Sequence, residues 1–380
     1  MADNTATLDS LAGALGRAGQ QPGGALKLLE TVSGRLRRMV GFDGLAMNAT
    51  DPASLLPTCP VRVENVAPAH TCDAYWQRES LVEDANLFRD LARASQPVAT
   101  LSAATGGDPA RSARFREFLE PQGYREELRA ALRVGATTWG FVSIFRERAR
   151  SPFTDRDVQT VAAAGPVIAA ALRDLAGSPT QEPSARPTRA ADGPGTALFD
   201  SKHTLLSLDQ QAQRWFTELA GPQWQSWTPP AMTGIMAIIG RARAVATGQD
   251  SRPASARLRT SSGLWLTAHA SCLSGPDGEP GPIAMIIEPA KSAQIAPIIV
   301  EAYRLTPREQ QITLALSRGQ SNREIALDLH LSANTVRDHL KAIFAKMGVN
   351  SRGELTAKLF ADHYRPALHD PAAPIAHVDI

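Results

Sequence analysis

The chain has 380 residues, enough for two or three domains of ordinary size, each with its own hydrophobic core. Its 40 Lys and Arg residues against 38 Asp and Glu leave a formal net charge of +2. The overall charge therefore points neither to a polyanion partner nor to a membrane surface. Any interaction with nucleic acid must rest on the local placement of basic residues.

The cysteines and the apolar segments indicate the compartment. Cys59, Cys72 and Cys272 are odd in number and lack the spacing of a structural zinc site, so we expect free thiols, no disulfide framework, no metal and no cofactor. The first ten residues do not resemble a secretory signal, and the apolar run 162–172 is too short to span a bilayer. The sequence predicts a soluble cytoplasmic protein that does not interact with a membrane.

The first half of the chain predicts a mixed α and β domain. After residues 1–21, which we expect to form an N-terminal tail, a domain is expected over 22–176. A tight reversal is predicted at Gly135-Ala136, and Thr154 is a predicted helix cap with Asp157 three residues later. The predicted strands are 45–49, 61–66, 97–102, 126–134 and 137–147.

The end of this domain resembles a known sensor fold. Residues 139–172, with the sequence Pro-Phe-Thr-Asp at 152–155, resemble the last two strands and the terminal helix of GAF domains. The resemblance covers roughly residues 22–175 and implies an α+β fold that hosts many ligands and some enzymes. A small-molecule ligand is therefore a candidate partner of this domain.

Four residues of a predicted aromatic and acidic helix in this domain could line a ligand pocket, namely Tyr75, Trp76, Asp84 and Phe88. The alternative is that the aromatic residues pack in the core. His70 and Cys72 could suggest haem or a metal, although lone His and Cys residues are usually structural. Cys59 and Cys72 leave open a thiol enzyme of GAF fold, although no neighbouring base or cation is evident.

A linker and a second domain follow. Residues 177–195 hold four prolines and no aromatic or branched aliphatic residue, so we expect a linker there. Residues 196–290 read as strand, turn, strand and helix, then an apolar helix ending at Gly248, then two strands joined by a Gly/Pro turn. This order resembles a small α+β PAS-like domain. No internal repeat is evident in the sequence.

A short apolar stripe precedes the last domain. In the predicted connector helix, 291–304, apolar residues recur at helical spacing: Ile295, Ile298, Ile299, Ala302 and Tyr303. We hypothesise that this helix couples the preceding domains to the last one, either by docking them together or by pairing two chains. A simple packed connector is the alternative.

The last domain, expected over 305–364 before a C-terminal tail at 365–380, carries the strongest signal. Three capping boxes begin helices, at Thr306 to Glu309, Ser321 to Glu324 and Ser351 to Glu354. A fourth helix is predicted over 333–347, capped by Ser332. Its apolar stripe contains Val336, Leu340, Ile343, Phe344 and Met347, and its opposite side contains Asn334, Asp338, Lys341, Ala342 and Ala345. A face of small and hydrogen-bonding side chains suits a DNA major groove.

About 56 residues of this all-α, four-helix module, including LTPRE, SNREIA and LSANTVRDHL, resemble the LuxR-type helix-turn-helix of bacterial transcription regulators. The resemblance implies that helix 333–347 enters the major groove of double-stranded DNA. Its implied DNA-binding residues are Asn322, Arg323, Asn334, Thr335, Arg337, Asp338, Lys341, Lys346 and Arg352. The family often has Lys at the position of Arg337 and an apolar or small residue at that of Asp338. Asp338 either pairs with Lys341 and weakens non-specific phosphate attraction, or accepts a hydrogen bond from a cytosine amino group.

The sequence thus predicts a sequence-specific transcription regulator that is not an enzyme. We expect a homodimer, at least on DNA, with RNA polymerase as a further candidate partner. No GxxxxGK[ST] motif for nucleotide hydrolysis is present. The alternatives are the thiol enzyme of GAF fold, or a signalling scaffold whose last domain is a helical docking module.

Overall fold

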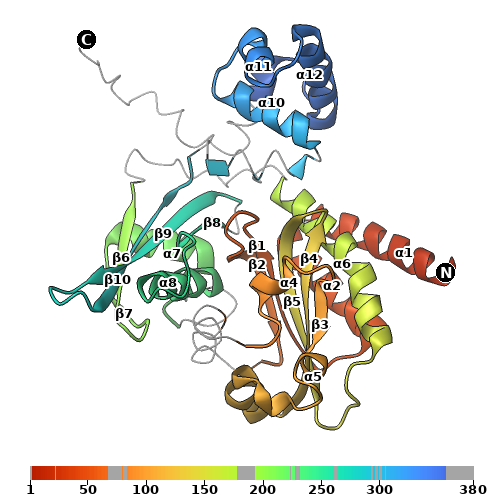
Figure 1. Cartoon of the computed structure of the whole chain (residues 1–380), viewed down its shortest axis with the longest axis vertical. Coiled ribbons are helices and arrows are strands. Elements are labelled where there is room, and N and C mark those ends of the chain that lie inside the picture. Colours follow the sequence, from red (N-terminus) through yellow and green to blue (C-terminus); the bar gives the residue numbers. More distant parts are fainter. Residues whose placement is uncertain are drawn as a thin grey trace.

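The computed structural model contains two α+β domains and a small helical domain (Figure 1). It describes residues 2–21, 23–66, 79, 84–177, 193–222, 224–226, 232–260, 263–291, 294–295, 298, 302–303 and 305–356. Within these residues, no helix is long and apolar enough to cross a membrane.

The first domain is built on a five-stranded antiparallel sheet of order β2-β1-β5-β4-β3. Its strands are β1 (Gly44–Thr50), β2 (Pro57–Glu64), β3 (Val98–Thr100), β4 (Tyr124–Val134) and β5 (Thr137–Glu147). The predicted strand 137–147 is confirmed, and the others overlap the observed strands, β2 starting four residues earlier than expected. The predicted reversal is confirmed at Gly135, which has a φ of +61°.

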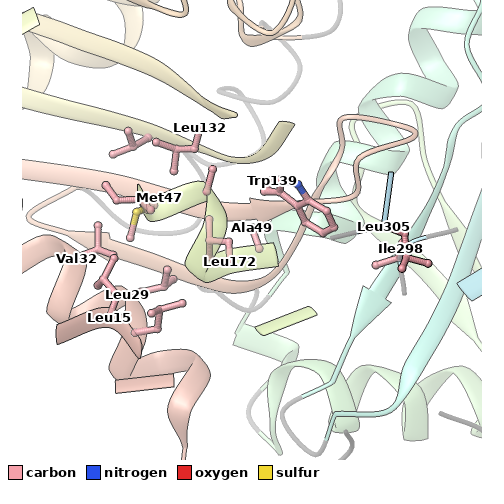
Figure 2. Close-up of a cluster of buried hydrophobic side chains, with 14 of the residues drawn as sticks. Leu15, Leu29, Val32, Met47, Ala49, Leu132, Trp139, Leu172, Ile298 and Leu305 are labelled. Atoms are coloured by element: carbon pink, nitrogen blue, oxygen red, sulfur yellow. The ribbon is translucent and has the colours of Figure 1, made fainter. Parts of the chain in front are cut away.

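Three helices lie on one side of this sheet, two of them packed on its strands and α1 packed on those two helices (Figure 1). They are α1 (Ala2–Gly19), α2 (Gly24–Val40) and α6 (Asp155–Ala176). The predicted capping box of α6 is confirmed, because the Thr154 hydroxyl accepts from the Asp157 N–H while the Asp157 carboxylate accepts from the Thr154 N–H. These helices and the sheet enclose a hydrophobic core (Figure 2).

The expectation of an N-terminal tail over residues 1–21 is wrong. Residues 2–19 form α1, whose Leu11 and Leu15 are each only 1% exposed. Leu15 lies beside Leu29 of α2 in Figure 2. Leucines four residues apart share one helix face, and burial of that face against α2 and α6 stabilises the helix. The first domain therefore includes the residues from 2 onward.

The other face of the sheet carries short elements and a second core. The short elements are α4 (Phe88–Leu91), α5 (Leu101–Ala104), η1 (Pro109–Arg111), η2 (Phe115–Leu119) and η3 (Glu120–Gln122). Phe88 stacks on Phe141 of β5 with ring centroids 4.3 Å apart, which favours the core-packing interpretation of Phe88. The Asp84 carboxylate accepts hydrogen bonds from the backbone N–H groups of Ala85 and Arg114, so it joins two segments of the backbone. The other candidate pocket residues, Tyr75 and Trp76, lie outside the described residues, as do His70 and Cys72.

The second domain has a second antiparallel five-stranded sheet, of order β7-β6-β10-β9-β8. Its elements are β6 (Gly195–Phe199), β7 (Leu205–Leu208), α7 (Gln210–Ala220), η4 (Trp224–Ser226), α8 (Thr233–Ala246), β8 (Ser255–Arg259), β9 (Trp265–Ser274) and β10 (Pro280–Pro289). Numbered within each domain, the order is the same as in the first sheet. The two domains thus repeat one topology that leaves no repeat in the sequence.

The boundary of the predicted linker shifts by one residue at its end. Gly195 is the first residue of β6, and a Cβ there would lie 2.2 Å from the backbone nitrogen of Ala212 in α7. Only glycine allows strand and helix to approach so closely. Gly177 caps the end of α6, and residues 178–192 lie outside the described residues.

Polar contacts join the two α+β domains. Asp51, at the end of β1, forms a salt bridge with Arg257 of β8, and their side chains are only 3% and 11% exposed. The Arg257 Nη1 donates to the carbonyl of Gln294, 2.8 Å away, in the predicted connector. One arginine thus contacts the first domain and the connector at once.

The described residues of the predicted connector helix are packed against this interface. Gln294, Ile295, Ile298 and Ala302 are helical, and Ile299 lies outside the described residues. Ile295 is fully buried and Ile298 is 2% exposed. Since a side chain covered within its own chain cannot also contact a second chain, these two residues support docking rather than chain pairing.

Candidate DNA-binding surface

Reciprocal caps begin the first two helices of the last domain, α10 (Pro307–Ser317) and α11 (Asn322–Asp328). The Thr306 Oγ1 accepts from the Glu309 N–H, and the Glu309 Oε2 accepts from the Thr306 N–H at 2.7 Å. Ser321 and Glu324 repeat the arrangement, with the return bond at 2.6 Å. Both predicted capping boxes are confirmed.

In the third predicted capping box, the return hydrogen bond comes from the residue before the predicted cap. The Ser351 Oγ accepts from the Glu354 N–H at 3.0 Å, as expected. The Glu354 Oε2, however, accepts from the N–H of Asn350 at 2.7 Å. Helix follows over 352–356 with Leu355 fully buried, while Leu359 lies outside the described residues.

The helix that the sequence assigns to the major groove is α12 (Ala333–Met347). The Ser332 Oγ accepts from the Thr335 N–H at 3.0 Å and caps it, while Gly348 ends it with a φ of +63°. The predicted apolar stripe faces α10 and α11, with Val336, Leu340, Ile343 and Met347 buried and Phe344 partly buried. Packing of this stripe fixes which side of α12 faces solvent.

The solvent-facing side of α12 carries four exposed polar residues: Asn334, Arg337, Asp338 and Lys341. We call these four the α12 face. Arg323, near the start of α11, is also exposed, whereas Asn322 and Thr335 are half-buried. The Thr335 hydroxyl lies 2.9 Å from the Ser332 Oγ, so it shares the helix cap.

Asp338 and Lys341 form an ion pair one turn apart. The Lys341 Nζ lies 3.6 Å from the Asp338 Oδ1, with the two side chains 74% and 76% exposed. The geometry matches the pairing hypothesis. Such an exposed pair contributes little to stability, because water screens both charges. The Asp338 carboxylate therefore weakens the positive potential of the α12 face without fixing its structure.

Lys346 and Arg352 have partners within the domain. The Lys346 Nζ lies 2.6 Å from the Glu309 Oε2, so the end of α12 is joined to the start of α10. Burial alone would raise the pKa of Glu309, but hydrogen bonds from Lys346 and Thr306 lower it below its usual range. Arg352 donates to the carbonyl of Gln320 at 2.7 Å. Both basic groups hold the domain together, a role that the sequence prediction missed.

Most acids of the domain lie away from the α12 face. Residues 305–356 contain seven Lys and Arg and five Asp and Glu. Three acids serve as cap acceptors and Asp328 accepts from Gln320. Hydrogen bonds from Ser321 lower the pKa of Glu324. Asp338 is thus the one acid of these five on the α12 face, where Arg337 and Lys341 give a net positive charge.

Residues 303–359 match the family model described as bacterial regulatory proteins, luxR family. The C-terminal domain is a LuxR-type helix-turn-helix. Among relatives, the probable HTH-type transcriptional regulator GfsR of Streptomyces halstedii is 33% identical over 92 residues, which are 23% of this chain and 38% of GfsR. The uncharacterized transcriptional regulatory protein YhcZ of Bacillus subtilis is 40% identical over 62 residues, which are 16% of this chain and 28% of YhcZ. The chain thus spans under half the length of these relatives.

Similarity to solved structures is weaker. Escherichia coli SdiA is 13% identical with a TM-score of 0.30, and the match covers 93% of this chain and 96% of SdiA. A Vibrio VqmA complex with ligand and DNA is 16% identical with a TM-score of 0.24, covering 45% and 83% of the two chains. Scores this low do not establish a shared fold for the two N-terminal domains.

The thiol of Cys59 does not have the properties of a nucleophile. Cys59 as a whole residue is half-buried, but burial of its thiol raises the pKa to about 11. A nucleophilic cysteine has a lowered pKa, since the thiolate is the reactive form. Across the described ranges, no group of three or more His, Cys, Asp or Glu residues could hold a metal ion.

Proposed function

We propose that the protein is a sequence-specific DNA-binding transcription regulator without catalytic activity. The observation that carries this is the α12 face, which presents Asn334, Arg337 and Lys341 to solvent on a helix fixed by two caps and a buried stripe. Hydrogen-bonding and cationic side chains on a rigid helix are what major-groove readout requires. The LuxR-type match of this domain and the regulators among its relatives support the same function.

We further propose that the two N-terminal domains are GAF-like and PAS-like sensors. Both have five-stranded antiparallel sheets of one strand order, with helices against the sheet. A small molecule or a protein would favour one arrangement of these domains and thereby change the population competent to bind DNA. Two copies of the helix-turn-helix would then bind a two-fold symmetric site. The contact from Arg257 to the connector supports such coupling.

Fluorescence anisotropy over a series of salt concentrations tests the DNA-binding proposal. A fragment selected from a genomic library by the purified full chain serves as the probe. We expect Arg337→Ala and Lys341→Ala to weaken binding, by about 1–3 kcal/mol for a base-contacting arginine, and loss of one phosphate contact to reduce the salt slope by about 1. Arg318→Ala is the matched control, because Arg318 is exposed at the end of α10 and is not one of the four residues of the α12 face. Unchanged affinity and slope in both α12 variants would refute the proposal.

A further inference from the structure

The second sheet has an exposed face, whereas the central strands of the first sheet are covered on both sides. In the first domain, residues 138–146 of β5 are all buried, because α2 and α6 lie on one face of the sheet and the short elements on the other. In the second domain, Ala197, Ala270 and Met285 are buried in the core that the sheet shares with α7 and α8. Within the described residues, the second sheet thus lacks a layer that the first sheet has.

The strand register places a set of residues on this exposed face. Side chains alternate between the two faces of a sheet, and residues paired across strands share a face. One row of pairs crosses β9, β10, β6 and β7, and a second row crosses β9, β10 and β6. We call these residues the outer sheet face: Ser271, Ala284, Leu198 and Ser207 in the first row, His269, Ile286 and Thr196 in the second, and Leu273 two residues beyond Ser271.

The outer sheet face is uncharged and partly apolar. It contains no Lys, Arg, Asp or Glu, although Ile286 and Leu273 are 48% and 46% exposed. The next row toward the connector pairs Thr267 with Glu288 and Arg257, so it carries both signs of charge. Surfaces that face only water are rich in charged residues, whereas the centres of protein interfaces are depleted of them and their rims are polar. The outer sheet face therefore has the composition of an interface centre.

The absence of charge favours a second copy of the chain as the partner. A nucleic acid or an acidic protein would be recognised by Lys or Arg, and the outer sheet face has neither. In a two-fold pair, a charged residue near the axis would meet its own copy and repel it. The central strand of the sheet is β10, and its residues on this face, Ala284 and Ile286, are apolar and cause no such repulsion.

The area of the outer sheet face limits the strength of such a pair. Four strands about 4.8 Å apart, each with at most about three outward residues spaced by about 6.8 Å, span roughly 400 Å². Two copies would bury roughly 800 Å² together, less than the about 1,200–2,000 Å² of stable interfaces. We therefore expect a weak pair in solution, which becomes stable where DNA holds two copies side by side.

We propose that the outer sheet face pairs with the same face of a second copy of this chain. The two sheets pack face to face about 10 Å apart, with Ala284 and Ile286 at the centre of the contact. The apolar stripe of the connector is less suited to pairing, because Ile295 and Ile298 are buried within their own chain. The need for two copies on DNA rests on the proposed function. The pairing itself does not, and it can be measured without DNA.

Analytical ultracentrifugation of the full chain without DNA, from low to several hundred micromolar, tests the pairing. We expect the average mass to rise from that of one chain toward that of two, with a dissociation constant in the micromolar range or weaker. Ile286→Lys and Ser271→Lys should each weaken the pairing at least about tenfold, because they bring like charges together. Ser271 is exposed, so lysine at this position should leave the fold intact, as the thermal unfolding midpoint at low concentration verifies.

The matched control is Val245→Lys, which also replaces an exposed apolar residue by lysine. Val245 is 40% exposed near the end of α8 and is not part of the outer sheet face, so this variant should pair as the unaltered chain does. A mass that stays that of one chain at every concentration would overturn the proposal, and so would unweakened pairing in Ser271→Lys. A chain that pairs as expected but does not bind the selected DNA fragment would support this surface and refute the proposed function instead.

Discussion

The salt bridge between Asp51 and Arg257 offers a direct test of how firmly the two α+β domains are joined. In the unaltered chain, the Asp51 Oδ1 accepts a hydrogen bond from the N–H of Ala53 at 3.0 Å. Asp51→Asn removes the negative charge but keeps one side-chain oxygen that can accept this bond. It leaves the Arg257 guanidinium, 11% exposed, without its acid. Breaking a buried pair by removing one member costs about 3–5 kcal/mol. The free energy that holds the two domains together should fall by that amount. This corresponds to a decrease of roughly two to four orders of magnitude in the equilibrium constant for domain association.

Guanidinium denaturation followed by tryptophan fluorescence measures this loss, because Trp139 and Trp265 both line a small cavity at the interface. The double variant Asp51→Asn, Arg257→Met should regain most of the stability, since no unpaired charge remains. Arg148→Ala is the matched control, as it breaks a pair with Glu120 whose side chains are 66% and 45% exposed. A loss below about 1 kcal/mol in Asp51→Asn, equal to that of an exposed pair, would refute the reasoning.

Two further predictions concern Asp338 and Cys59. Asp338→Ala should tighten binding to all DNA sequences alike, since it removes the partner of Lys341. Fluorescence anisotropy with single-base variants of the DNA probe measures the affinity for each sequence. A change of preference at one base pair would contradict the prediction. For Cys59, a pKa of about 11 implies a thiolate fraction near ~10⁻³ at pH 8, so iodoacetamide should label the folded chain far more slowly than the urea-unfolded chain. The folded state binds the Cys59 thiol proton more tightly than the unfolded state does. The folding stability that this difference contributes is therefore complete below about pH 9 and is lost as the pH rises through about 11. Mass spectrometry identifies the labelled cysteine, and equal rates in both states would favour the thiol-enzyme alternative.

Elements with strong local signals could be predicted from the sequence. The capping boxes at Thr154, Thr306 and Ser321 lie where side chain and backbone pair within three residues, so a short stretch of sequence contains both partners. Strand β5 was predicted to the residue because its β-rich run is long and begins at a turn. Local hydrogen bonding and patterning thus determined these elements.

Features that depend on distant partners could not be predicted. Strand β8 carries two arginines in five residues, and it exists because it pairs with β9. Lys346 and Arg352 looked like phosphate anchors, because their partners Glu309 and Gln320 are 37 and 32 residues away. Asn334, Asp338 and Lys341 of the α12 face were predicted to lie opposite the apolar stripe, since a helical stripe requires an opposite side.

The bond between Lys346 and Glu309 has a consequence for how any signal could reach DNA. This bond joins the C-terminal end of α12 to the first turn of α10, while the buried apolar stripe fixes the middle of α12. Because α12 is fixed at both points, it cannot tilt or slide against α10 and α11 without breaking the bond between Lys346 and Glu309. The helix-turn-helix should therefore move as one rigid unit. In the dimer proposed above, an upstream event would then change the distance and angle between the two helix-turn-helix domains rather than the internal structure of either.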